Sequence, residues 1–221
     1  MAIPKNIFQT FKTAELPWIT RFYIHQMKKK NPGWKYEFYD DNRILEFFKK
    51  EFPPEYLKAY KSLTIGAAKA DFFRYAVLYK YGGLYIDIDS YDKTPLDQFL
   101  KPDDEFIVTH EGNPGLYCQW ALISNKNHPF LKRTLEKVLD NIQTHRFPND
   151  VHKTTGPTVY TDAVNEVLAE NPETPHRFLG TDFEGHLKFK YKLGRIFLYG
   201  NKSEHWKKKQ HSQDIIKPVD E

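Results

Sequence analysis

The stretch from residue 66 to residue 90 constrains the fold of this chain more than any other. Its first part repeats small and apolar side chains at helical spacing, and Gly82-Gly83 is a stop signal for a helix. Alternating apolar residues follow and lead into Asp87 and Asp89. The sequence therefore predicts a helix, a tight turn and a buried strand without a gap.

Two carboxylates near the end of this strand need a neutralising partner. Alternation predicts that Tyr85, Asp87 and Asp89 share one face and that the intervening apolar residues share the inward face. Acids about 6–7 Å apart repel each other unless a cation lies between them. Hard divalent cations take oxygen ligands, so we predict a metal site at Asp87 and Asp89. A metal that also holds a diphosphate, Mn²⁺ or Mg²⁺, fits best.

The preceding helix carries an acid and an arginine three residues apart. Asp71 and Arg74 are neighbours on one helix face, and the small Ala67 and Ala70 beside them leave room for a ligand. A surface ion pair is the alternative interpretation.

Taken together, these residues resemble a known family. The pattern Ala-Asp-x-x-Arg-Tyr-x-x-Leu-x-x-x-Gly-Gly-x-Tyr-x-Asp-x-Asp, which begins at Ala70, is similar to the DXD sugar-binding region of family thirty-two glycosyltransferases. Relatives include fungal mannosyltransferases and bacterial capsule enzymes. The resemblance also covers residues 3–11 and 31–41, and it fades after about Thr158. It implies a GT-A fold, a Rossmann-like domain that binds a nucleotide sugar.

The resemblance also implies roles for individual residues. Asp71 and Arg74 would hold the transferred sugar, Asp89 would ligate the metal, and Asp87 would contact the ribose or reach the metal through water. The opening strand would hold the nucleotide through these residues: Phe8, Gln9, Thr10 and Phe11. Either phenylalanine could stack on the base, although an aromatic residue here is more often part of the core. Tyr39 and Asp40 could approach the same base or ribose, but Asp40 is equally well a helix N-cap.

Further positions concern the acceptor and a third metal ligand. Residues expected to contact the transferred sugar or the acceptor are Glu111, Asn113, Gln119, Trp120 and Thr155. Thr155 could equally be a cap for the helix that follows. By resemblance, His205 returns from the far end of the chain to the metal, with His211 as the alternative. A structural role for either histidine is as consistent with the sequence.

The order of elements predicts an α/β fold. We expect strands at 5–11, 36–39, 84–89, 105–110 and 119–123, and helices at 18–30, 43–52, 54–63, 66–81, 129–144 and 158–170. Such alternation favours a mixed, mostly parallel sheet flanked by helices, with ligands beyond the carboxyl ends of the strands. No linker or repeat divides the chain, so we expect one domain over residues 1–221.

Composition narrows the partners and the compartment. The formal charge is +4, and lysines cluster at 28–30, 49–50 and 207–209, which suits peripheral contact with an anionic membrane or a solvated surface. No nucleic-acid-binding motif accompanies them. A single cysteine, Cys118, excludes an internal disulfide. With no apolar run long enough for a signal peptide or a membrane span, we expect a cytoplasmic enzyme, or one at the inner face of the membrane.

These features predict a retaining, metal-dependent glycosyltransferase that moves a hexose from a UDP- or GDP-sugar to a hydroxyl of a glycan or lipid-linked acceptor. One alternative is a non-catalytic module that binds a nucleotide sugar or a glycan. A metal-dependent phosphohydrolase is a weaker alternative, because the Asp-x-Asp-x-Thr motif of one such class would need threonine where this chain has Tyr91.

Overall fold

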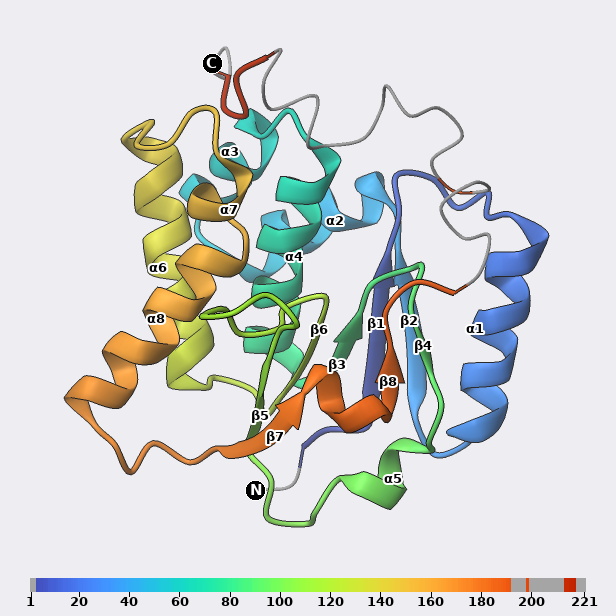
Figure 1. The fold of residues 1–221 in the computed structure, drawn as a ribbon. Helices are drawn as coiled ribbons and strands as arrows, with labels where there is room; N and C mark the ends of the chain where they lie inside the picture. Colours follow the sequence, from blue (N-terminus) through green and yellow to red (C-terminus); the bar gives the residue numbers. More distant parts are fainter. Residues whose placement is uncertain (1–2, 192–197, 199–212, 218–221) are drawn as a thin grey trace.

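A six-stranded sheet organises the computed structural model, which describes residues 3–191, 198 and 213–217 (Figure 1). The strand order is β2-β1-β3-β6-β5-β7, and every strand runs parallel to the others except β6. The strands are β1 (Asn6–Thr10), β2 (Lys35–Tyr39), β3 (Gly83–Ile86), β5 (Phe106–His110), β6 (Ala121–Ser124) and β7 (Arg177–Thr181). A second, two-stranded sheet pairs β4 (Tyr91–Asp92) with β8 (Leu187–Lys188). The predicted mixed, mostly parallel sheet is confirmed.

Helices cover both faces of the sheet. One face carries α2 (Asp41–Glu51), α3 (Pro54–Ser62), α4 (Gly66–Tyr81), α6 (Pro129–Gln143), α7 (Val151–Thr154) and α8 (Pro157–Glu170). The other face carries α1 (Trp18–Lys30) and the short α5 (Leu96–Phe99), and Figure 1 shows α1 across the sheet from α4. The 3₁₀ turn η1 (Asp182–Gly185) follows β7. Each face of the sheet therefore has its own apolar core.

The helix α4 lies at the centre of the larger core. Every side chain from Asp71 to Leu78 is buried, as expected for a helix that is apolar on nearly all sides. Gly82 ends the helix with φ 63°, and Gly83 has φ 123°. A Cβ on Gly83 would lie 2.4 Å from the backbone oxygen of Asn6, so only glycine lets β3 approach β1 this closely.

The two aspartates lie beyond the strand and not on it, so their predicted placement on one strand face was wrong. The strand β3 ends at Ile86, and the backbone N–H of Ser90 donates to the carbonyl of Asp87 at 2.9 Å, which closes a turn. Aspartate favours such turns. Both faces of β3 are buried: Tyr85 packs in the α4 core, and Leu84 and Ile86 pack in the core on the α1 side.

Most predicted elements are present, with small shifts at their ends. Helices α1 and α4 have the predicted bounds. The edge strand β7 was not predicted, because its sequence Arg177–Thr181 has little apolar alternation. Gly156, and not Thr155, is the N-cap of α8. Within the described residues, no helix has the length and apolarity to span a bilayer.

Candidate active site

The fold brings α4 and the end of β3 together at one edge of the sheet. The turn at Gly82-Gly83 reverses the chain, so β3 runs back along α4. Arg74 near the middle of the helix therefore meets Asp87, which follows the strand. The carboxyl ends of β1 and β5 lie at the same edge, where ligands of parallel sheets bind.

Arg74 connects two of the predicted site carboxylates. Its Nη1 lies 3.0 Å from Oδ1 of Asp71, and its Nη2 lies 2.9 Å from Oδ1 of Asp87. Nη1 also donates to the backbone carbonyl of Gln119 at 2.8 Å and to its side-chain oxygen at 2.5 Å. The guanidinium covers the ring of Tyr85, with 4.8 Å from Cζ to the ring centroid. Arg74 Nε is buried without a hydrogen-bond partner among the described residues.

Asp71 is buried and held on both oxygens. Besides Arg74, Gln119 Nε2 donates to Oδ1 at 3.2 Å and Thr155 Oγ1 donates to Oδ2 at 3.1 Å. Burial raises the pKa of Asp71 to about 6, although Arg74 opposes this shift. The structure thus brings Gln119 and Thr155, which lie 48 and 84 positions after Asp71 in the sequence, into one cluster with Asp71 and Arg74.

Burial disfavours the charged forms of Asp87 and Asp89, although Arg74 and Lys190 oppose this shift. Burial raises the pKa of Asp87 even though Arg74 favours the ionised form. For Asp89, burial and then the nearby charge of Asp87 raise the pKa to about 7. The Asp89 residue is only 3% exposed, whereas the side chain of Asp87 is 25% exposed. Two carboxylates in this state fit a divalent cation, because oxygen ligands of this kind suit Mn²⁺ or Mg²⁺.

Three further side chains belong to this cluster, although they were not predicted as site residues. Tyr75 OH donates toward Gln119 Oε1 at 2.8 Å, Tyr85 OH donates to Asp87 Oδ1 at 3.1 Å, and Tyr36 OH donates to Gln9 Oε1 at 3.0 Å. The signal for Tyr75 and Tyr85 was available, since both tyrosines stand within the pattern that also contains Asp71 and Asp87. Tyr36 gave no such signal.

The predicted nucleotide-binding residues divide into two groups. Gln9 reaches the site, where its Nε2 donates to the carbonyl of Asp87 at 3.1 Å, and the half-buried Phe11 lies just past the end of β1. Phe8 and Tyr39 instead pack in the α4 core at 2% and 7% exposure. Of the two phenylalanines proposed to stack on a base, only Phe11 therefore presents an accessible ring.

Two polar residues of this group serve the local backbone. Thr10 Oγ1 donates to the carbonyl of Tyr39 at 2.8 Å, which ties β1 to the end of β2. Asp40 is the N-cap of α2 and accepts from the backbone N–H of Arg43 at 2.8 Å. The N-cap interpretation of Asp40 is thus realised in the structure.

The predicted acceptor residues Glu111, Asn113 and Trp120 lie around the cluster without bonding to its side chains in the described part of the chain. Oε2 of Glu111 is buried without a partner among the described residues, and Asn113 is exposed in the loop after β5. Trp120 stacks on Phe189 at 5.2 Å between centroids, and its carbonyl accepts from Asp87 N–H at 2.8 Å. Trp120 thus supports the Asp87 backbone.

The third metal ligand was predicted to be His205 or, alternatively, His211. Both histidines lie outside the described residues. Among residues 3–191, 198 and 213–217, no three His, Cys, Asp or Glu side chains gather as a metal site. The described chain therefore offers the two carboxylates alone.

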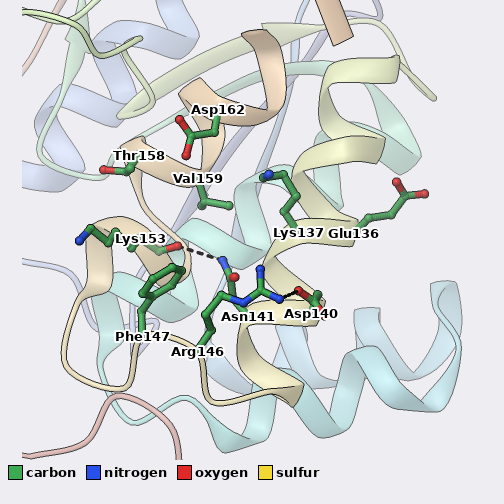
Figure 2. Close-up of a pocket in the computed structure, with 10 residues that line it drawn as sticks. All are labelled: Glu136, Lys137, Asp140, Asn141, Arg146, Phe147, Lys153, Thr158, Val159 and Asp162. Carbon is green, nitrogen blue, oxygen red and sulfur yellow. Dashed lines mark hydrogen bonds and ion pairs between the residues drawn. The ribbon is translucent and has the colours of Figure 1, made fainter. Parts of the chain in front are cut away.

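A surface pocket of about 580 Å³ lies between α6, α7 and α8, away from this cluster (Figure 2). Two polar contacts join residues of its lining. Arg146 contacts Asp140 at 2.8 Å, and Asn141 Nδ2 donates to the carbonyl of Lys153 at 2.9 Å. Its lining includes Lys153 and Thr158, whereas Thr155 between them points to Asp71.

Comparison with known proteins gives the family. Residues 19–106 match the family described as the glycosyltransferase sugar-binding region containing the DXD motif. An uncharacterised glycosyltransferase of Acanthamoeba polyphaga mimivirus is 34% identical over 178 residues, which cover 77% of this chain and 68% of the viral protein. The chain belongs to the DXD glycosyltransferase family. The matched region contains the four charged residues of the cluster: Asp71, Arg74, Asp87 and Asp89.

Other members of the DXD family are named mannosyltransferases. The initiation-specific alpha-1,6-mannosyltransferase of Candida albicans is 27% identical over 215 residues, 79% of this chain and 56% of the fungal protein. Inositol phosphoceramide mannosyltransferase 3 of Schizosaccharomyces pombe is 31% identical over 160 residues, 71% of this chain and 43% of that protein. The chain thus spans about half the length of these relatives.

Solved glycosyltransferase domains share the fold. The PaToxG glycosyltransferase superimposes with a TM-score of 0.61 at 22% identity, covering 77% of this chain and 70% of that one. The ligand-free glycosyltransferase domain of the YGT toxin gives 0.60 at 10% identity, covering 80% of each chain. The predicted GT-A architecture is therefore confirmed.

Proposed function

We propose that this DXD glycosyltransferase moves a hexose from a nucleotide sugar to a hydroxyl of a glycan or lipid-linked acceptor, with retention of anomeric configuration and with a divalent metal. One observation carries the proposal. Asp71, Arg74 and Asp87 form a connected, largely buried cluster at the ligand-binding edge of the sheet, next to Asp89. Because relatives are named mannosyltransferases, mannose is the first sugar to test.

Asp87 and Asp89 are the residues that would hold Mn²⁺ or Mg²⁺. Both carboxylates lie just past the end of β3, and carboxylate oxygens are ligands that these cations prefer. When bound, the metal would act as a Lewis acid for the leaving nucleoside diphosphate. The remaining ligands would come from the diphosphate, water or His205.

The chain's own contribution is to position the donor. Asp71 can accept hydrogen bonds from hydroxyl groups of the sugar. Arg74 contacts Asp71 through Nη1 and Asp87 through Nη2, which fixes the two carboxylates relative to each other. We expect Gln9 and Phe11 to lie on the nucleotide side, and Glu111 and Asn113 on the acceptor side.

We infer retention from the family resemblance, and the contacts of Asp71 favour a front-face route to it over a double displacement. A double displacement needs a carboxylate free to attack the anomeric carbon, but both oxygens of Asp71 accept hydrogen bonds from the protein. In the alternative reaction, the bond from the anomeric carbon to the diphosphate breaks while the acceptor oxygen bonds to the same face. The acceptor proton passes to the departing phosphate oxygen, so the protein needs to supply only position and electrostatics.

Donor hydrolysis tests this function directly. UDP-glucose, UDP-galactose, UDP-N-acetylhexosamines and GDP-mannose are each incubated with the protein and Mn²⁺, and release of nucleoside diphosphate is measured. We expect turnover of one donor and its loss in Asp89→Ala. Wild-type turnover in Asp89→Ala at saturating Mn²⁺ would contradict the metal role.

The same screen separates the non-catalytic alternative. A ligand that binds only the folded state at 100 times its Kd stabilises the protein by about 2.7 kcal/mol, which a thermal melt detects. Thermal stabilisation by a donor without hydrolysis, and without transfer to any glycan, would show a binding module instead of an enzyme.

A further inference from the structure

The outer face of α1 exposes aromatic and basic side chains in one stripe. Trp18, Phe22, His25 and Lys29 follow one another at helical spacing and are all exposed, and Arg21 lies beside them. Trp18 is 61% and Phe22 49% exposed, which places them among the few large apolar side chains at the described surface. We call these five residues the α1 stripe.

The α1 stripe lies opposite the side that anchors the helix. The opposite side of α1 anchors the helix, since Thr20 and Met27 are buried and Tyr23 stacks on Tyr191 at 4.2 Å between centroids. Exposing a tryptophan and a phenylalanine one turn apart to water costs free energy, and an apolar environment would remove this cost. Their exposure therefore indicates a partner.

The charge of α1 indicates what this partner is. The helix contains no acidic residue, and it carries Arg21 and the run Lys28, Lys29 and Lys30. Lys30 pairs with Asp92 at 3.4 Å, whereas Arg21 and Lys29 have no ion pair with a carboxylate in the described part of the chain. Aromatic and basic side chains together on a helix suit an anionic bilayer surface, where rings lie at the headgroup boundary and cations meet lipid phosphates.

The stripe begins at the same end of the molecule as the candidate active site. The helix α1 follows the carboxyl end of β1, which is parallel to β3. In Figure 1 its first turn lies at the upper right, at the end toward which β1 and β3 point. Trp18 and Phe22 in the first two turns therefore lie nearer to that edge than Lys29 does.

We propose that the α1 stripe docks this protein on a bilayer that contains anionic phospholipids. This docking is independent of the transfer activity, since neither the cluster around Arg74 nor a metal takes part. The proposal assigns membrane contact to the lysines of α1 and not to Lys49 and Lys50. These two lie in the last turn of α2 on the other face of the sheet, and α2 exposes no large apolar side chain.

Vesicle co-sedimentation tests the docking. The full chain is mixed with phosphatidylcholine vesicles with and without 30 mol% phosphatidylglycerol, at low and high salt. We expect binding only to the anionic vesicles, reduced by salt. Trp18→Ala/Phe22→Ala and Arg21→Glu/Lys29→Glu should each lower the partition coefficient by about tenfold or more.

Matched controls carry the same chemistry elsewhere on the surface. Phe178→Ala removes a phenylalanine that is 48% exposed, and Lys49→Glu/Lys50→Glu reverses two lysines outside the stripe. Both controls should bind vesicles like the wild type, and all variants should keep the wild-type melting temperature and donor hydrolysis. The proposal is overturned if the wild type does not bind, if the stripe variants bind equally well, or if the controls lose binding to the same extent. Dimerisation that depends on Trp18 and Phe22, without vesicle binding, would overturn it in favour of self-association.

Discussion

Two arginines lie at opposite edges of the same sheet, and their surroundings differ. At the amino ends of β5 and β7, Arg177 binds Asp104 with both arms: Nε donates to Oδ1 at 2.7 Å and Nη2 to Oδ2 at 2.6 Å. Nη2 also donates to the carbonyl of Phe99 at 3.0 Å, and the backbone N–H of Lys101 donates to Asp104 at 2.7 Å. Although burial opposes ionisation, these donors hold the pKa of Asp104 below its usual value.

The arginine at the ligand-binding edge is not balanced in this way. Arg74 faces Asp71 and Asp87, with Asp89 nearby, and burial raises the pKa of all three acids. Its Nε lacks a partner among the described residues. The contacts of Asp104 favour its ionised form, whereas burial favours the neutral forms of the acids around Arg74. Perturbed carboxyl groups of this kind are the basis on which we propose the cluster as the functional site.

Asp89→Asn should give the largest change in activity and should leave stability intact, which would distinguish the two edges of the sheet. Removing the charge deprives the proposed metal of a ligand, so donor hydrolysis should fall by about a hundredfold or more. The metal-free variant should be at least as stable as the wild type, because a buried like charge has been removed. Initial rates with Mn²⁺ and urea unfolding in EDTA measure the two quantities. A stable variant that keeps its rate would refute the role of Asp89.

Asp104→Asn should show the opposite pattern. The substitution leaves Arg177 without its bidentate partner, and breaking a buried pair costs about 3–5 kcal/mol of unfolding free energy, at the lower end here because Arg177 is partly exposed. Donor hydrolysis per folded molecule should not change. Urea unfolding provides the measurement, with the exposed neighbour Asp103→Asn as control, expected within about 0.5 kcal/mol of wild type. A loss of activity beyond the loss of folded protein would show that the two edges are coupled.

His128 lies at the same edge of the sheet as Asp104, and its titration should make the stability of the protein depend on pH. Its Nδ1 accepts from Phe130 N–H at 3.3 Å, and its Nε2 lies 2.9 Å from the carbonyl of Pro175, so the neutral ring is satisfied. Burial lowers the pKa of His128 to about 4. The unfolded chain, with an ordinary pKa near 6.5, binds this proton first as the pH falls. Stability is therefore complete above about pH 6.5 and falls as the pH drops toward 4, by up to about 3 kcal/mol.

The variant His128→Asn tests whether His128 causes this loss of stability, because asparagine can cap α6 without titrating. Unfolding free energies of the wild type and of His128→Asn are compared between pH 7.5 and pH 4.5. The difference between the two proteins should shrink or reverse at low pH. Parallel curves would show that His128 does not titrate as its burial implies.

The sequence predicted α4 well, for physical reasons. A long apolar repeat followed by Gly82-Gly83 specifies a helix and its end through local interactions alone. Asp71, Arg74 and Asp87 lie within one supersecondary unit, so their proximity follows from its geometry. The single strand face assigned to Asp87 and Asp89 failed, because alternation does not reveal where a strand turns out of the sheet.

Contacts over long sequence separations were not readable in the same way. Asp104 and Arg177 form a bidentate ion pair from residues 73 positions apart, and nothing local to either predicts the other. The edge strand β7 was missed for a related reason, since its pairing with β5 supplies what its own sequence lacks. Thr155 was expected at the site by resemblance, but its contact with Asp71 spans 84 positions and needed the fold.

Substitutions of two adjacent threonines should change activity the least of these variants. They also compare a residue that contacts Asp71 with a neighbour that contacts only the backbone. Thr154 and Thr155 are both fully buried, but Thr155 Oγ1 donates to Asp71 at 3.1 Å, while Thr154 Oγ1 donates to the carbonyl of Phe147 or of Asp150, each at 2.8 Å. Valine at either position keeps the shape and removes one hydrogen bond, so each variant should lose about 1 kcal/mol of unfolding free energy. Only Thr155→Val should also slow donor hydrolysis, by several-fold, because Asp71 loses a donor that orients it. Equal rates in the two variants would mean that Thr155 matters to the packing of α7 alone, and that Arg74 and Gln119 suffice to hold Asp71.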